Sequence, residues 1–219
     1  MKKELLLSKL QGFDPEIFAL LQDEIQRQRY MLSLVPNNNA MSPFAHYLEG
    51  SLLANSAFDA QNPNANSTNL EEIAIKRAKK LFGSEHAVVR LGNIGAASRV
   101  VCLALLQPNS RVLSFNLRKA EHCSGLSFTF KNFGIDAKKQ VLDWDEVEQT
   151  ADETKPHLII FSPVSYPRNA NYRRLSEIAR KVGAYLWVDI GQSVGLVAAG
   201  LLPSPVPFAD VVTFPTNDS

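Results

Sequence analysis

Short runs of uncharged apolar residues alternate with amphipathic helical stretches along most of the chain. Two such runs, LIIF at residues 158–161 and YLWV at residues 185–188, are typical of strands buried on both faces of a parallel sheet. Between them, apolar residues at positions 175, 178, 179 and 182 share one helical face, and the helix is expected to end at Gly183. The pattern predicts an α/β fold with a mostly parallel sheet and helices on both faces.

The same reading divides the chain into an N-terminal arm with an extended segment at residues 1–69, and a large α/β domain at residues 70–219. Asp14-Pro15 predicts the start of an arm helix, because it places a cap residue before a proline at the first helical position. Further strands are expected at 87–89, 112–115, 137–141 and 210–213. Further helices are expected at 43–54, 68–82, 95–107, 119–131 and 144–153.

Composition and charge exclude several classes of function. The chain has 219 residues with 23 Lys and Arg against 22 Asp and Glu, so its net charge of +1 gives no footprint for nucleic acid or anionic membrane. No apolar run approaches the roughly 18 residues of a transmembrane helix. Cys102 and Cys123 have no CxxC spacing and are expected to be buried free thiols in a reducing compartment. The expected location is the cytoplasm.

One acidic residue stands where chemistry is expected in a sheet of this kind. Asp189 follows the apolar run 185–188 directly, and ligands of open α/β sheets bind beyond the carboxyl ends of the strands. The alternative is that Asp189 only caps the helix that follows. No metal site is predicted, since His86 and His157 lack metal-ligand spacing with any partner.

Three segments carry a resemblance to a known family. They are EEIAIKRAKKLFGSEHAVV at 71–89, KPHLIIFSPVSYPR at 155–168 and GAYLWVDIGQSVGLVAAGLLPSPVPFADVVT at 183–213. Together they resemble serine hydroxymethyltransferase, a pyridoxal-phosphate enzyme of fold type I that acts on serine and glycine in one-carbon metabolism. The resemblance implies an aminotransferase-type large domain. It also implies that the C-terminal small domain, and the strand that follows the family's lysine, are absent after Ser219.

The family's chemistry requires a lysine for the Schiff base, a carboxylate at the pyridinium nitrogen and a phosphate-binding loop. By resemblance, Asp189 matches that carboxylate. His122 matches the histidine that stacks on the cofactor ring, although an ordinary surface or capping histidine is the alternative. Asn93 and Gly95 fall in the phosphate loop, where Ile94 replaces a glycine. These four positions, Asp189, His122, Asn93 and Gly95, are expected to be vestigial cofactor contacts.

The remaining motifs depart from the family. The family's VDMAH reads VDIGQ here, so Gln192 replaces its histidine. The family's DVVTTTTHK reads DVVTFPTND, so Asn217 replaces the second histidine and Asp218 replaces the lysine. No lysine or arginine follows Lys181 in this sequence. A carboxylate cannot form an imine, so no catalytic residue and no covalently bound pyridoxal phosphate are expected.

Three functions remain open at this point. The first is a non-catalytic protein that associates as a homodimer, or as a heterodimer with a full-length homologue. In the family, the arm and the region of Ala57 and Asp59 reach the neighbouring active site, where these two residues replace a tyrosine and a glutamate. The second is a truncated remnant of a hydroxymethyltransferase. The third is a residual binder of a non-covalent ligand.

Overall fold

The computed structural model describes all residues except 1–2, 36–37, 39, 56–65, 116–127, 164–165 and 217–219, and only the backbone of residues 3–6 and 66–67. Two compact units are present, Met1–Asn38 and Asn39–Ser219. The predicted boundary at residues 69 and 70 stays a prediction. None of the helices in the described part is long and apolar enough to cross a membrane.

The first unit consists of α1 (Lys3–Phe13) and α2 (Pro15–Tyr30), which pack on each other. Helix α2 begins as the sequence predicted, because the carboxylate of Asp14 accepts a hydrogen bond from the backbone N–H of Ile17 at 3.0 Å. None of its residues is buried. Its apolar stripe therefore faces outward within this unit.

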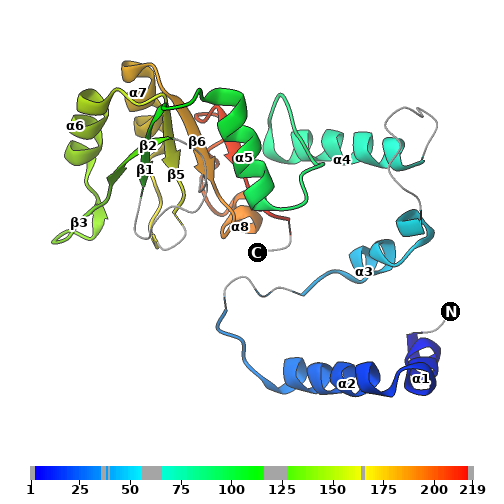
Figure 1. Ribbon diagram of the computed structural model, residues 1–219. Coiled ribbons are helices and arrows are strands. Elements are labelled where there is room, and N and C mark those ends of the chain that lie inside the picture. Colours follow the sequence, from blue (N-terminus) through cyan, green and yellow to red (C-terminus); the bar gives the residue numbers. More distant parts are fainter. Residues whose placement is uncertain are drawn as a thin grey trace. The chain divides into compact units, whose positions relative to one another are not determined.

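The second unit is built on a five-stranded sheet in the order β2-β1-β5-β6-β7, in which every neighbouring pair is parallel (Figure 1). The five strands are β1 (Arg111–Phe115), β2 (Thr129–Phe133), β5 (Leu158–Phe161), β6 (Tyr185–Asp189) and β7 (Val211–Thr213). A separate antiparallel pair is formed by β3 (Ile135–Asp136) and β4 (Val141–Leu142). The mostly parallel α/β fold predicted from the sequence is confirmed.

Helices pack on both faces of this sheet: α5 (Ile94–Leu105) contacts β7, while α6 (Trp144–Thr154) contacts β1 and β2 and α7 (Tyr172–Val182) contacts β6. The unit also contains α3 (Pro43–Glu49), the 3-10 helix η1 (Leu52–Asn55), α4 (Asn66–Phe82) and α8 (Val194–Ala198). Figure 1 shows α6 and α7 on one side of the sheet and α5 on the other. Every residue of β5 is buried because alternate side chains enter the two layers: Ile159 packs with α6 and α7, and Ile160 packs with α5.

Local sequence determines where helix α7 begins and ends. The side chain of Asn171 accepts a hydrogen bond from the backbone N–H of Arg174 at 3.1 Å and so caps the first turn. The helix ends at Gly183, whose φ of 74° lies in the left-handed region that glycine adopts without steric cost. Leu175 and Ile178 point into the core. The predicted end of this helix at Gly183 is confirmed.

Three sequence predictions of secondary structure are wrong. Residues 86–91 form neither helix nor strand, and among the described residues no strand pairs with residues 87–89. Residues 129–131, predicted as helix, belong to β2, because pairing with the edge of β1 overrides a weak helical pattern. The single strand predicted at 137–141 is a hairpin instead. Its turn is held by Asp136, whose carboxylate accepts the N–H groups of Lys138 and Lys139.

The predicted free thiol at Cys102 is also wrong. Cys102 is fully buried on the inner side of α5 and forms a disulfide. Spacing along the sequence does not show which sulfur atoms come within bonding distance in a fold. Cys123, the other cysteine of the chain, lies outside the described residues.

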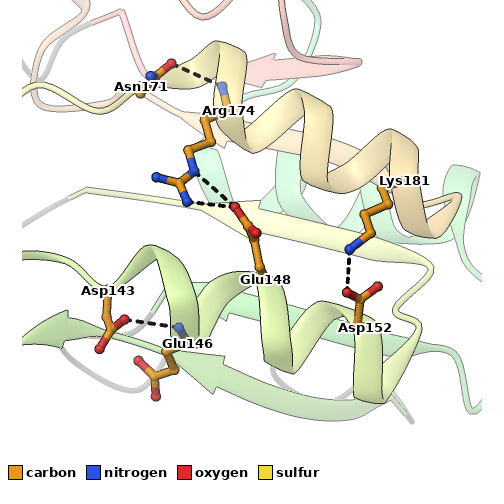
Figure 2. Close-up of polar contacts among 7 residues, drawn as sticks. All are labelled: Asp143, Glu146, Glu148, Asp152, Asn171, Arg174 and Lys181. Carbon is orange, nitrogen blue, oxygen red and sulfur yellow. Dashed lines mark hydrogen bonds and ion pairs between the residues drawn. The ribbon is translucent and has the colours of Figure 1, made fainter.

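Two ion pairs join α6 to α7 along their exposed sides (Figure 2). Arg174 binds Glu148 at 2.8 Å, and its guanidinium also lies 4.8 Å from the ring centre of Trp144. Lys181 binds Asp152 at 2.6 Å. Exposed pairs of this kind add little to stability, so the packing of apolar residues between the helices holds this layer together.

We predict that Lys181→Met raises the pKa of Asp152 toward its ordinary range. That pKa is lowered first by the hydrogen bond from Lys181 and then by the one from Lys155. A lowered folded-state pKa means that the contribution to stability is present above the unfolded pKa, about 4, and is lost as the pH falls through the folded value. NMR titration of the Asp152 carboxyl carbon measures the change. Lys80→Met is the control, and an unchanged Asp152 titration in Lys181→Met would contradict the prediction.

Candidate functional site

A chain of hydrogen bonds connects β6 to β7 at the carboxyl edge of the sheet. The indole N–H of Trp187 donates to the hydroxyl of Thr213 at 2.8 Å, and that hydroxyl donates to Oδ2 of Asp189 at 3.2 Å. The other carboxylate oxygen, Oδ1, accepts the backbone N–H of Gly191 at 2.8 Å. Asp189 is only 5% exposed. Its carboxylate is thus oriented by one donor from β7 and one from the turn that follows β6.

Two roles were considered for Asp189: a ligand contact at the sheet edge and the N-cap of the next helix. The residue lies at the sheet edge, where the sequence predicted ligand chemistry. It does not cap α8, because the N-cap of that helix is Ser193. Instead it stabilises the turn that leaves β6, through its bond to Gly191. The helix-cap alternative for Asp189 is therefore wrong.

A second polar side chain lies at the same edge. Ser162 follows Phe161 of β5, and Phe161 pairs with Val188, the residue before Asp189. The hydroxyl oxygen of Ser162 is buried, and it has no hydrogen-bond partner in the described part of the chain. Buried hydroxyls are normally satisfied, so this oxygen marks the edge between β5 and β6 as a place with spare hydrogen-bonding capacity.

The turn after β6 approaches the segment after β7 closely. A Cβ atom built on Gly191 would lie 3.1 Å from Oδ1 of Asp189 and 3.1 Å from Cδ of Pro215. Such distances are shorter than ordinary van der Waals contact. The family motifs VDMAH and DVVTTTTHK have alanine and threonine at these two positions. The glycine and the proline therefore fit each other in this chain.

The phosphate-loop positions lie at the start of α5. Asn93 is the N-cap, and its side-chain oxygen accepts the backbone N–H of Ala96 at 2.8 Å. A Cβ on Gly95 would lie 3.3 Å from the same oxygen. Ser98 is buried, and its hydroxyl donates to the carbonyl of Ile94 at 2.8 Å. The first turn of α5 is thus capped by the chain itself.

A cleft of about 470 Å³ opens beside Asp189 on the side of α7 and α8. Asp189 and Gln192 both line it, so the structure brings these two predicted positions together. Asn93 and Gly95 belong to α5, which packs on β7. The sequence does not predict the cleft, because the other residues that line the cleft come from separate segments between positions 163 and 203. His122, Asn217 and Asp218, like Ala57 and Asp59, lie outside the described residues.

A parallel sheet covered on both faces, with its polar groups at the carboxyl edge, defines an α/β protein of the kind that holds ligands at that edge. The profile of the family described as "Serine hydroxymethyltransferase" matches residues 10–219. The chain belongs to the serine hydroxymethyltransferase family.

Two relatives show how far the similarity extends. The chain is 40% identical over 219 residues to the serine hydroxymethyltransferase of Coprothermobacter proteolyticus, an alignment that covers 93% of this chain and 52% of that protein. It is 37% identical over 224 residues to the probable serine hydroxymethyltransferase of Rickettsia bellii, covering 96% of this chain and 53% of the relative. The chain therefore spans about half the length of these curated relatives.

Enzymes of this family depend on pyridoxal phosphate. The assignment of Asp218 to the lysine position, made from the resemblance, stays a prediction because residue 218 lies outside the described residues. Both oxygens of Asp189 already accept hydrogen bonds from the protein. The side chain of Asn93 uses an N–H of the first turn of α5, where an anion would otherwise bind. Within the described ranges, no group of three His, Cys, Asp or Glu residues could hold a metal ion.

We predict that Gly191→Ala destabilises the protein and that Pro215→Ala partly rescues it. The added methyl group overlaps Pro215 and Asp189, and overpacking of this kind costs about 1–3 kcal/mol. Removing the proline ring opens one of these contacts, so a double-mutant cycle should give a favourable coupling of about 0.5–3 kcal/mol. Urea unfolding of the four proteins measures these values.

Gly92→Ala is the matched control, because no atom lies within 4 Å of a Cβ at that position. It should change the free energy of unfolding by less than about 0.5 kcal/mol. If the substitutions at positions 191 and 215 change the free energy of unfolding additively, the two residues are not energetically coupled and the prediction is contradicted.

Proposed function

We propose that this chain is a non-catalytic member of the serine hydroxymethyltransferase family that acts by associating with a second copy or with a longer relative. The proposal includes the cytoplasmic location expected from the sequence. It does not require serine–glycine exchange by this chain, because Asp218 cannot form the Schiff base on which that chemistry depends. The partner belongs to the same family, in which the arm reaches the neighbouring subunit.

The observation that supports association most directly is the apolar face of α2. Ile17, Leu20, Leu21 and Ile25 recur at helical spacing and so share one face. Their exposed fractions are 51%, 65%, 38% and 36%. An amphipathic helix gains most of its stability by burying such a face, so this arm is suited to pack on another chain.

Apolar side chains are also exposed on the helices of the α/β unit. Val100 and Leu103 lie on the outer side of α5, and Leu70 and Ile73 lie on α4. They supply a second surface on the same molecule that a partner of the family can cover.

We predict that Leu20→Glu abolishes association. The charge lies at the most exposed position of the α2 face, where contact with a partner would force its costly desolvation. The test co-expresses the tagged chain with the Coprothermobacter proteolyticus relative and measures both co-purification and the mass of the complex. Gln26→Glu is the matched control, because it adds the same charge on the opposite side of α2.

Two results would contradict this prediction. One is a monomeric chain that does not co-purify with the relative. The other is equal loss of association in Leu20→Glu and Gln26→Glu, which would indicate a general effect of charge on the arm.

We predict that pyridoxal phosphate forms no specific imine with this chain. After addition of the aldehyde and reduction with borohydride, peptide mapping by mass spectrometry should find only scattered modification of surface lysines. The relative from Coprothermobacter proteolyticus, treated in parallel, is the positive control and should be modified at one lysine. Stoichiometric modification of one residue of this chain, together with conversion of serine to glycine, would overturn the proposal.

A further inference from the structure

The cleft beside Asp189 has the size and composition of a small-molecule site. Its volume of about 470 Å³ falls in the range of about 300–1,000 Å³ that is usual for ligand pockets. Most of its lining is apolar, with a few polar groups at the edge. The lining consists of Pro163, Tyr166–Ala170, Tyr172, Asp189–Ser193, Leu196, Val197, Leu202 and Pro203.

Two tyrosines of the cleft wall are held in place by contacts within the protein. The hydroxyl of Tyr166 accepts the backbone N–H of Leu142 at 3.1 Å, and its ring packs edge-on against Phe115 at 5.7 Å. Tyr172 is buried at the first position of α7, and its ring packs against Phe161. Prolines 163, 167 and 203 also line the cleft, and the ring of each proline fixes its own φ. Wall residues that are already held in place lose little conformational entropy on binding.

Arg168 gives the cleft its charge. Its Nε donates to the carbonyl of Gln140 at 3.0 Å, which holds the guanidinium in place. No carboxylate in the described part of the chain forms an ion pair with Arg168. Because Nε is already bonded, the terminal nitrogens remain to donate to a ligand in the planar arrangement that matches a carboxylate or phosphate.

The one acidic group of the lining does not offset this charge at the surface of the cleft. Asp189 is buried, and both of its oxygens accept hydrogen bonds from Gly191 and Thr213. Gln192 and Asn169 add carboxamide groups, which donate as well as accept. The cleft thus offers one cation, two amides and an apolar wall of Leu196, Val197 and Leu202.

We infer that this cleft binds a small organic anion, with the anionic group on Arg168 and an apolar body against the wall formed by α8 and Leu202. The anionic group is a carboxylate or a phosphate, both of which fit the guanidinium. This site requires neither the lysine nor the phosphate loop of the family, so it is independent of the proposed association.

The test uses three fluorinated probes of one size, observed by ¹⁹F NMR with the full chain. They are 4-fluorobenzoate, 4-fluorophenyl phosphate and the neutral 4-fluorobenzyl alcohol. We expect saturable binding of at least one anionic probe, and binding of the alcohol weaker by about tenfold, as for loss of one charged hydrogen bond. Comparison of the affinities for 4-fluorobenzoate and 4-fluorophenyl phosphate shows which anionic group the site prefers.

Three variants locate the site. Arg168→Gln should lower the affinity for the anionic probe by about tenfold. Arg173→Gln is the matched control, because Arg173 lies over the ring of Phe208 at 5.3 Å and does not line the cleft. Leu196→Trp fills the cleft from a residue that is 47% exposed, so it should block binding of all probes without disturbing the core. Circular dichroism confirms that each variant is folded.

The inference is overturned if no probe binds at its solubility limit, or if the alcohol binds as tightly as both anions. It is also overturned if Arg173→Gln weakens binding as much as Arg168→Gln does. Should Arg168→Gln fail to fold, Leu196→Trp still decides the location: unchanged binding in that variant would place the probe outside the cleft.

Discussion

The hydrogen bonds from Trp187 through Thr213 to Asp189 determine how the last two strands meet at the edge of the sheet. The indole of Trp187 is fully buried beneath α5, so its N–H must find a partner inside the protein. The hydroxyl of Thr213 accepts this hydrogen bond and itself donates one to Asp189. A buried carboxylate is tolerated here because Thr213 of β7 and the turn at Gly191 each donate a hydrogen bond to it. The position of the following turn, and of the cleft beside it, depends on this arrangement.

Much of the fold follows from apolar patterning, and the exceptions have physical causes. The runs at 158–161 and 185–188 predict β5 and β6 correctly, because a strand buried on both faces leaves no room for charge. The pattern at 87–89 is just as apolar, yet no strand forms there, since a strand also needs a neighbour with which to pair. The phenylalanines near residue 130 fit either periodicity, and only the open edge of β1 decides for β2.

The candidate site was predictable only in part. The place of Asp189 follows from the rule that chemistry lies beyond the carboxyl ends of strands. Its hydrogen bonds do not follow, because Thr213 and Gly191 approach it through the tertiary structure. The cleft and Arg168 were missed for a similar reason. The carbonyl of Gln140 that orients Arg168 belongs to a hairpin turn 28 positions earlier in the sequence, and no local sequence pattern predicts such a contact.

The fit between Gly191 and Pro215 also limits the routes by which this chain could change. Proline fixes its own φ and lacks an N–H, so Pro215 restricts the backbone of the segment that directly follows β7. An alanine at position 191 would meet the ring of Pro215, whereas a smaller residue at position 215 leaves more room for it. The order in which these two positions are exchanged therefore decides whether the intermediate sequence is overpacked. The tight turn makes positions 191 and 215 interdependent in any sequence that shares this fold.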